Sequence, residues 1–198
     1  MEINYFGEKK EDSPQSELLK KVREVKALGD GEPLYRDAEI VIRELNTDEI
    51  HPSALYLLKG NMEFVEKMYH DLLKSGIDIL DLDQVVESDG YIVGPPLVEV
   101  WDGVNIIVDG AHRIALARKL GKKIKTIVVS GVKESRPLFS FPVEWDEVIT
   151  YEVKPEKAEL LRKLRIDNYD TETKLNCFRD LTCLTKMENR RPMSWEKR

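Results

Sequence analysis

The sequence predicts an α+β fold: a small mixed β-sheet with helices packed on it and extra helices at both ends of the chain. Two observations lead to this class. Short runs of branched apolar residues, typical of strands, alternate along the chain with segments in which apolar residues recur every three or four positions, typical of helices. In the middle of the chain, two strand-like runs, a helix and a third strand-like run follow one another through tight turns.

The expected strands are rich in Val, Ile and other apolar residues and are bounded by turn residues. They cover residues 39–45, 97–101, 104–108, 124–129 and 147–153. Because Asp102-Gly103 is a dipeptide suited to a tight turn, the second and third of these strands are expected to form a hairpin. Residues 77–88 follow no single period and receive no assignment.

The expected helices are marked by apolar stripes and by start and stop residues. They cover residues 16–28, 61–74, 111–120, a stretch from Pro155 to Ile166, and 171–186. The chain is therefore expected to divide into an N-terminal arm and helix (1–38), a central domain (39–153), and a C-terminal helical extension with a tail (154–198).

Composition limits the classes of function. The chain carries 31 Lys and Arg against 37 Asp and Glu, a net charge of −6, which disfavours attraction of the whole surface to nucleic acid or anionic lipid. No apolar run approaches the roughly 18 residues that cross a bilayer, and the first residues lack the apolar segment of a signal peptide. We expect a cytoplasmic protein with no membrane partner. Cys177 and Cys183 form no C-x-x-C pair and are expected to be reduced and structural.

The strongest candidate site follows the strand 104–108, where Asp109-Gly110 leads directly into a helix. The free N–H groups and the positive dipole end of such a helix attract anions. Asp109 is expected to be the N-cap, Gly110 to let a phosphate approach the backbone, and His112 and Arg113 to act as donors. Asp109 could position Arg113, hold a divalent metal or accept a proton.

The segment 109–133 is strongly basic. It contains seven Lys or Arg and one acidic residue, so its net charge is +6 while that of the rest of the chain is −12. Such a contrast is expected of a phosphate-attracting face. The cluster 119–125 also fits a solvated helix end, where cations are favoured near the C-terminal dipole. Both interpretations stay open.

Several stretches around this site carry a family resemblance. They are residues 95–98 (Pro-Pro-Leu-Val), 107–117 (Ile-Val-Asp-Gly-Ala-His-Arg-Ile-Ala-Leu-Ala), 120–121 (Leu-Gly) and 45–52 (Leu-Asn-Thr-Asp-Glu-Ile-His-Pro). Together, over about residues 45–129, they resemble the core of the ParB/sulfiredoxin superfamily. The last stretch is similar to that superfamily's first strand and its Ile-x-Pro turn.

The resemblance implies a small mixed-sheet fold that binds a nucleotide or phosphate at the start of the helix. The cofactor would be ATP, ADP or another nucleotide, with Mg²⁺ on Asp109. The residues that the resemblance places at the nucleotide are Gly110, Ala111, His112 and Arg113. Asp109, His112 and Arg113 are the corresponding catalytic candidates.

The residues also discriminate among branches of the superfamily. Sulfiredoxins have a catalytic cysteine at the position of Ala111, so thiol chemistry is excluded there. The pattern Asp-Gly-x-His-Arg is closer to free-serine kinases and ParB-like nucleases than to the Gly-Glu-Arg-Arg of partitioning proteins. The kinases take a base from the loop after the first strand. Here that loop contains Glu49 and His51, in the reverse of the family's order, and both are further catalytic candidates.

The leading hypothesis is a nucleotide-binding protein that transfers a phosphoryl group to a small hydroxyl compound or hydrolyses a nucleoside triphosphate. A ParB-like nuclease or DNA-binding module is the first alternative; it would use Arg113, Arg118 and the basic cluster, and the net charge disfavours it. A non-catalytic interaction domain is the second. The expected partners are a nucleotide and a small-molecule substrate, and the oligomeric state is left open.

Overall fold

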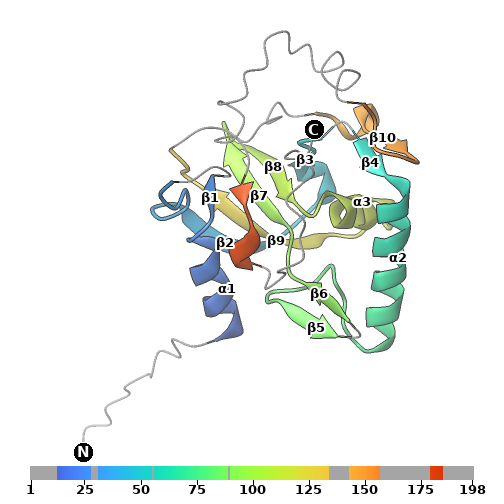
Figure 1. Ribbon diagram of the computed structural model, residues 1–198, viewed down its shortest axis with the longest axis horizontal. Helices are drawn as coiled ribbons and strands as arrows, with labels where there is room; N and C mark the ends of the chain where they lie inside the picture. Colours follow the sequence, from blue (N-terminus) through green and yellow to red (C-terminus); the bar gives the residue numbers. More distant parts are fainter. Residues whose placement is uncertain are drawn as a thin grey trace, which may run out of the picture.

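A five-stranded mixed sheet forms the centre of the fold, in the order β2-β9-β7-β8-β3 (Figure 1). The structure is a computed structural model that describes residues 13–27, 31–54, 56–88, 90–133, 143–156 and 179–184. The strands of the central sheet are β2 (Glu39–Leu45), β9 (Ile124–Ser130), β7 (Leu97–Trp101), β8 (Val104–Asp109) and β3 (Ile50–His51). The sheet and its helices confirm the expected α+β class.

The pairing of the strands explains why the sheet is mixed. β2 pairs antiparallel with β9 along its whole length, and β7 pairs antiparallel with β8. β7 and β9 run parallel, as do β3 and β8. The hairpin between β7 and β8 turns at Asp102 and Gly103, whose φ angles are +51° and +80°. Positive φ at both central residues suits the right-handed twist of a hairpin, so the expected turn is confirmed.

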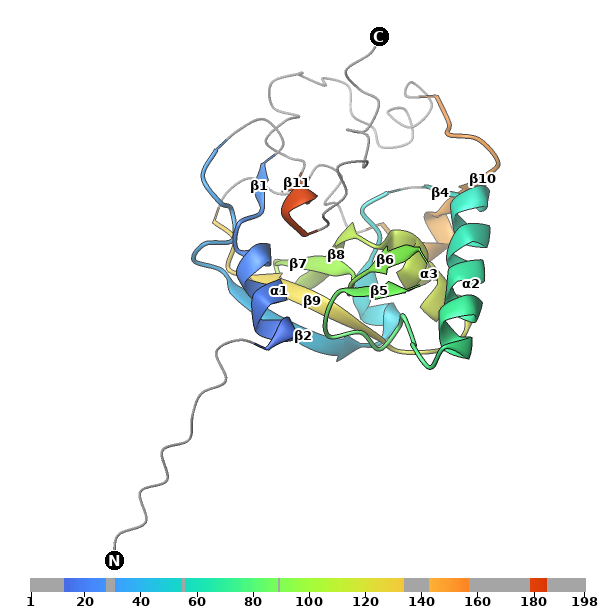
Figure 2. The same ribbon diagram turned by 60° about the horizontal axis from the view of Figure 1, so that its bottom comes forward.

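Helices cover both faces of this sheet because side chains alternate along each strand. α2 (Lys59–Lys74) and α3 (Ala111–Lys119) pack on one face, against a core that includes Val98, Ile107 and Val128. α1 (Pro14–Val22) packs on the other face, in the core that contains Leu97 and Ile127. Figures 1 and 2 show α1 well apart from α2 and α3.

The remaining elements are short. They are the strand pairs β1 (Lys26–Ala27) with β11 (Arg179–Asp180), β4 (Tyr56–Leu58) with β10 (Ile149–Tyr151) and β5 (Val86–Ser88) with β6 (Tyr91–Val93), and the 3₁₀ turns η1 (Thr47–Glu49), η2 (Trp145–Glu147) and η3 (Thr182–Leu184). Among the described helices, none is long and apolar enough to cross a lipid bilayer. The domain boundaries at 38/39 and 153/154 stay predictions.

Two expected helices differ from the structure. α1 ends at Val22 instead of residue 28, because the chain turns and enters β1. The helix expected over 171–186 is wrong at residues 179–184, which form β11 and η3; its other residues lie outside the described part of the chain, as does most of the helix expected from Pro155. Cys183 in η3 is a free, partly buried thiol, and burial raises its pKa to about 11. Cys177 lies outside the described residues.

A buried ion pair explains why residues 179–184 are not helical. Glu99 on β7 is fully buried and accepts hydrogen bonds from Arg179 Nε at 2.6 Å and Nη2 at 3.0 Å. It also accepts from Trp101 Nε1 at 2.7 Å and from the Tyr35 hydroxyl. Burial, followed by the charge of Glu99, raises the pKa of Tyr35, which therefore stays a donor. A buried carboxylate requires such partners, and this requirement outweighs local helix propensity.

Replacing Arg179 by Ala is expected to lower the free energy of unfolding by about 3–5 kcal/mol, because it leaves the buried Glu99 without its countercharge. Urea denaturation measures this loss. Arg36→Ala is the matched control, since Arg36 pairs with Glu32 at an exposed position and its loss should change stability little. Equal effects of the two substitutions would show that the buried pair does not hold this part of the fold together.

Candidate functional site

The candidate site forms where β8 ends. Leu97 pairs with Asp109 while Val98 pairs with Ile107, so Val108 is an extra residue that bulges out of the ladder just before Asp109. Such bulges reorient the side chains beside them. Gly110 then adopts φ +86°, in the left-handed region, and α3 begins at the next residue.

Asp109 does not cap α3, contrary to expectation. Gly110 occupies the N-cap position in the left-handed conformation, and no side chain caps the helix. Asp109 Oδ2 instead lies 3.4 Å from Arg113 Nη2. Of the three roles considered for Asp109, this contact corresponds to the positioning of Arg113. In the described part of the chain, the N–H groups of Ala111 and His112 find no acceptor.

Gly110 is required by protein packing. A Cβ at this position would lie 2.7 Å from Pro96 Cβ and 2.9 Å from Arg113 Nη2. Arg113 Nη1 donates to the Gly94 carbonyl, and only 11% of the Arg113 side chain is exposed. The missing side chain at Gly110 therefore makes room for Pro96 and Arg113, a packing role that the sequence did not suggest. Arg113 ties the loop 94–96 to the start of α3.

A second helix start lies beside the first. Leu58, the N-cap residue of α2, donates its backbone N–H to His112 Nε2 at 3.3 Å. Like α3, α2 has no capping side chain and no acidic residue in its first turn. The start of α2 is a part of the site that the sequence motifs did not indicate. The signal was present as the lack of a capping residue before Lys59 and of an acid before Glu63.

The contact with Leu58 determines which ring nitrogen of the neutral His112 carries the proton. Because Nε2 accepts a hydrogen bond, the neutral ring carries its proton on Nδ1. Burial lowers the pKa of His112, and the charge of Asp109 opposes that shift in part. A lowered pKa favours the neutral ring at pH 7.

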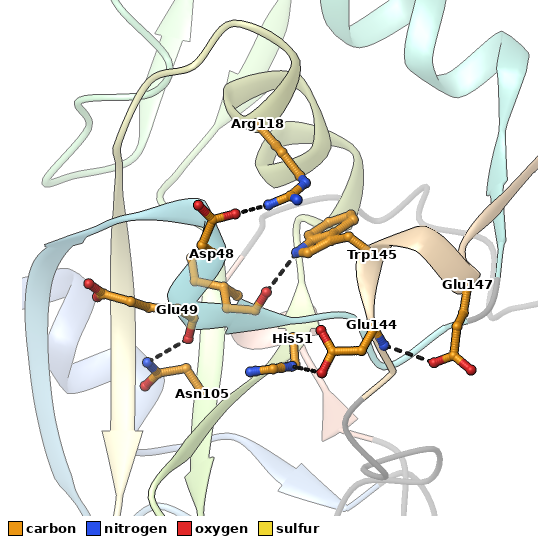
Figure 3. Close-up of polar contacts among 9 residues, drawn as sticks. Asp48, Glu49, His51, Asn105, Arg118, Glu144, Trp145 and Glu147 are labelled. Atoms are coloured by element: carbon orange, nitrogen blue, oxygen red, sulfur yellow. Dashed lines mark hydrogen bonds and ion pairs between the residues drawn. The ribbon is translucent and has the colours of Figure 1, made fainter.

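Glu49 and His51 contact residues other than Asp109: Figure 3 shows Glu49 beside Asn105 and His51 beside Glu144. The Glu49 carbonyl accepts from Asn105 near the start of β8, about 13 Å along the strand from its end. His51 pairs with Ile106, and its Nδ1 lies 3.7 Å from Glu144 Oε1. That nitrogen is buried without a hydrogen-bond partner in the described residues. The structure thus gathers Asp109, Gly110, Ala111, His112 and Arg113 but does not bring Glu49 to them.

Acidic partners offset the basic segment. Arg118 pairs with Asp48, and its guanidinium carbon lies 5.8 Å from the centre of the Trp145 ring (Figure 3). The lysines that follow are also engaged by acids; these pairs are Lys119 with Glu66, Lys122 with Asp78, Lys123 with Glu44, and Lys125 with Asp81. The positive charge seen in the sequence is therefore largely neutralised in space, and the solvated-surface interpretation describes this cluster better.

The metal expected at Asp109 has no prearranged cage. Within the ranges that the structure describes, no three His, Cys, Asp or Glu side chains gather as a metal site. Mg²⁺ is often held by one or two carboxylates together with substrate phosphates. The donor set at Asp109, whose side chain is 31% exposed, therefore suits Mg²⁺ only when a nucleotide supplies the other oxygens.

Gly110→Ala is expected to destabilise the fold by about 2–4 kcal/mol, since the new methyl group adds a collision with Pro96 to the strain of a left-handed backbone. Gly121→Ala provides the control. Gly121 has φ +62° but nothing within 4 Å of an added Cβ, so strain alone should cost it about 1–2 kcal/mol. Thermal unfolding compares the two, and a control that loses as much as Gly110→Ala would contradict the packing argument.

The lowered pKa of His112 predicts a loss of stability on acidification. The unfolded chain, with a His pKa near 6.5, binds the proton more readily than the folded chain, so the free energy of unfolding falls as the pH drops below about 6.5. Denaturation at pH 7 and pH 5 should show a smaller fall in His112→Gln than in the wild-type chain. Identical falls would mean that His112 is not the group responsible.

The chain matches a known family model. A family model described as "ParB CE domain" matches residues 17–149, more than half of the chain, while the comparisons with curated proteins and with solved structures give no match. The matched region contains the central sheet and the starts of α2 and α3. It confirms the resemblance to the ParB/sulfiredoxin superfamily, and the chain belongs to the ParB CE domain family.

Proposed function

We propose that this ParB-family protein binds the phosphate groups of a nucleotide, ATP or ADP being the first candidates, between the starts of α2 and α3. The observation that carries the proposal is the contact between two uncapped helix N-termini, linked by the Leu58–His112 hydrogen bond. Each helix end directs unpaired N–H groups and a positive dipole outward, which favours an anion. Two such ends together suit a group with several negative oxygens.

The side chains around the helix starts support an anion. Neither first turn contains an acidic residue that would repel phosphate. His112 carries its proton on Nδ1 and is partly exposed, so it is a neutral donor. Lys59, at the first position of α2, adds an exposed cation that is paired with Glu152 at 2.6 Å. A phosphate at the helix starts would compete with Glu152 for this ammonium group.

We further propose that the bound nucleotide serves phosphoryl transfer to a small hydroxyl compound, or hydrolysis. Asp109 lies three residues before His112, and its side chain is 31% exposed, so an acceptor hydroxyl, a water or Mg²⁺ can reach it. Arg113 acts as a positioning residue, since it is bound to Gly94 and Asp109. Glu49 and His51 are not needed in this scheme because of their distance along β8.

Asn61→Asp is expected to weaken ATP and ADP binding at least tenfold, because it places a carboxylate in the first turn of α2, where the phosphates would lie. The same change should not destabilise the helix, since an acid is favoured at a helix start. Isothermal titration calorimetry of the full chain, with and without Mg²⁺, measures the affinity.

Gln15→Glu is the matched control for Asn61→Asp. It adds one negative charge to the first turn of α1, on the other face of the sheet, and should leave nucleotide affinity unchanged. Absence of nucleotide binding by the wild-type chain, or equal weakening by the two substitutions, would refute the phosphate site.

Asp109→Asn is expected to retain most nucleotide affinity while reducing turnover of ATP at least a hundredfold, since it removes the carboxylate but preserves its size. Release of ADP or phosphate, with and without a mixture of small hydroxyl compounds, measures turnover. Nucleotide binding with no turnover by the wild-type chain would support the non-catalytic alternative. A binding signal from duplex DNA that weakens steeply with salt would support the nucleic-acid alternative.

A further inference from the structure

Within the described ranges, one long edge of the central sheet has no strand paired to it. β2 is a seven-residue edge strand whose residues all pair with β9, and no other described strand pairs with its outer side. The opposite edge strand, β3, has only two residues. Open edges usually carry protection such as Pro, Lys or a bulge. β2 contains no Pro, Lys or bulge and keeps one unbroken register; its sequence, Glu-Ile-Val-Ile-Arg-Glu-Leu, carries three charged residues.

The surface beside this edge is partly apolar and hollowed. A groove of about 460 Å³ runs between α1 and β2, and its lining includes Leu19, Ile40, Val41 and Ile42. Figure 2 shows β2 along the lower edge of the sheet with α1 in front of it. Arg23, at the end of α1, donates to the carbonyls of Tyr35, Arg36 and Ala38, which holds the approach to β2 in place. The edge is therefore a fixed surface.

The sequence of β2 is complementary to itself in one antiparallel register. When two copies pair with Val41 opposite Val41, Glu39 of each strand faces Arg43 of the other, and Ile40 faces Ile42. Two-fold symmetry produces each contact twice. Shifting the centre to Ile42 places Ile40 against Glu44 and removes the charge pairs, so the first register is favoured.

The charges required for this register are available. Arg43 is exposed, and in the described part of the chain its side chain has no ion-pair partner. Glu39 is also exposed and accepts one hydrogen bond, from Ser130 Oγ at 3.3 Å. Each can therefore pair with a second copy without breaking an existing ion pair.

We infer that β2 is a homodimer interface, at which a second copy of this chain adds antiparallel to β2, centred on Val41, and extends the sheet across both molecules. The backbone groups of the free edge would hydrogen-bond across the two-fold axis, while the Glu39–Arg43 pairs set the register. This interface is independent of the proposed nucleotide site, which lies at the end of β8, toward the other edge of the sheet.

Sedimentation equilibrium of the full chain tests this interface. The wild-type chain should form a dimer, and Arg43→Glu or Glu39→Arg should each raise its dissociation constant at least tenfold, because like charges then face each other. The double variant Glu39→Arg/Arg43→Glu restores opposite charges and should return the constant to within about threefold of wild type. Glu87→Arg, the same charge change on the exposed side of β5, is the control and should have no effect.

Hydrogen exchange adds a readout that does not depend on these substitutions. Amides of β2 should become more protected as protein concentration rises, while amides of β5 and β6 should not. A wild-type chain that stays monomeric at millimolar concentration would overturn the inference. So would a dimer that both single charge reversals leave intact, or a double variant that is no better than either single one.

Discussion

The close approach that Gly110 permits is the constraint on which the candidate site depends. With no side chain at this position, Pro96 and the Arg113 guanidinium pack against the backbone at the start of α3. Arg113 then binds Gly94 on one side and Asp109 on the other, which ties a strand end, a loop and a helix together. The bulge at Val108 and the left-handed glycine set the direction in which α3 leaves the sheet. As a result α3 begins beside α2, where His112 receives the Leu58 amide.

The positive charge at the candidate site comes from the helix starts and not from the nearby lysine side chains. Lysines that seem to form a basic patch in the sequence are paired with acids from other elements, so the surface carries little uncompensated positive charge there. The helix starts are different, because their partial charges arise from the backbone and lack acidic side chains in the first turns. A local backbone field of this kind can attract phosphate in a chain whose net charge is −6. This contrast supports the proposed nucleotide ligand over the nucleic-acid alternative.

On the other face of the sheet, a buried charged residue holds the packed elements together. There Glu99 places a charge in the core. Two of its partners, Tyr35 and Arg179, come from distant parts of the chain, and the third, Trp101, lies on the same strand. A carboxylate with these donors is satisfied, whereas with any of them missing it would be costly to bury. The pair therefore joins β11 and η3 to the same core as α1, as the contacts of Leu181 and Cys183 with that core also show. Stability at this face and the proposed ligand binding at the other depend on separate sets of residues.

Local pattern alone determined most of the central elements. The strand 39–45, the Asp102-Gly103 hairpin, the helix after Gly110 and the strand from Ile124 all rest on apolar periodicity or turn chemistry within a few residues, and the structure contains each of them. The gathering of Asp109 with His112 and Arg113 was also visible, because these residues lie within one turn. Only the tertiary structure decided the rest. Three long-range contacts cannot be predicted from local periodicity. Arg179 pairs with a glutamate 80 residues away, Pro96 packs on Gly110, and α2 meets α3.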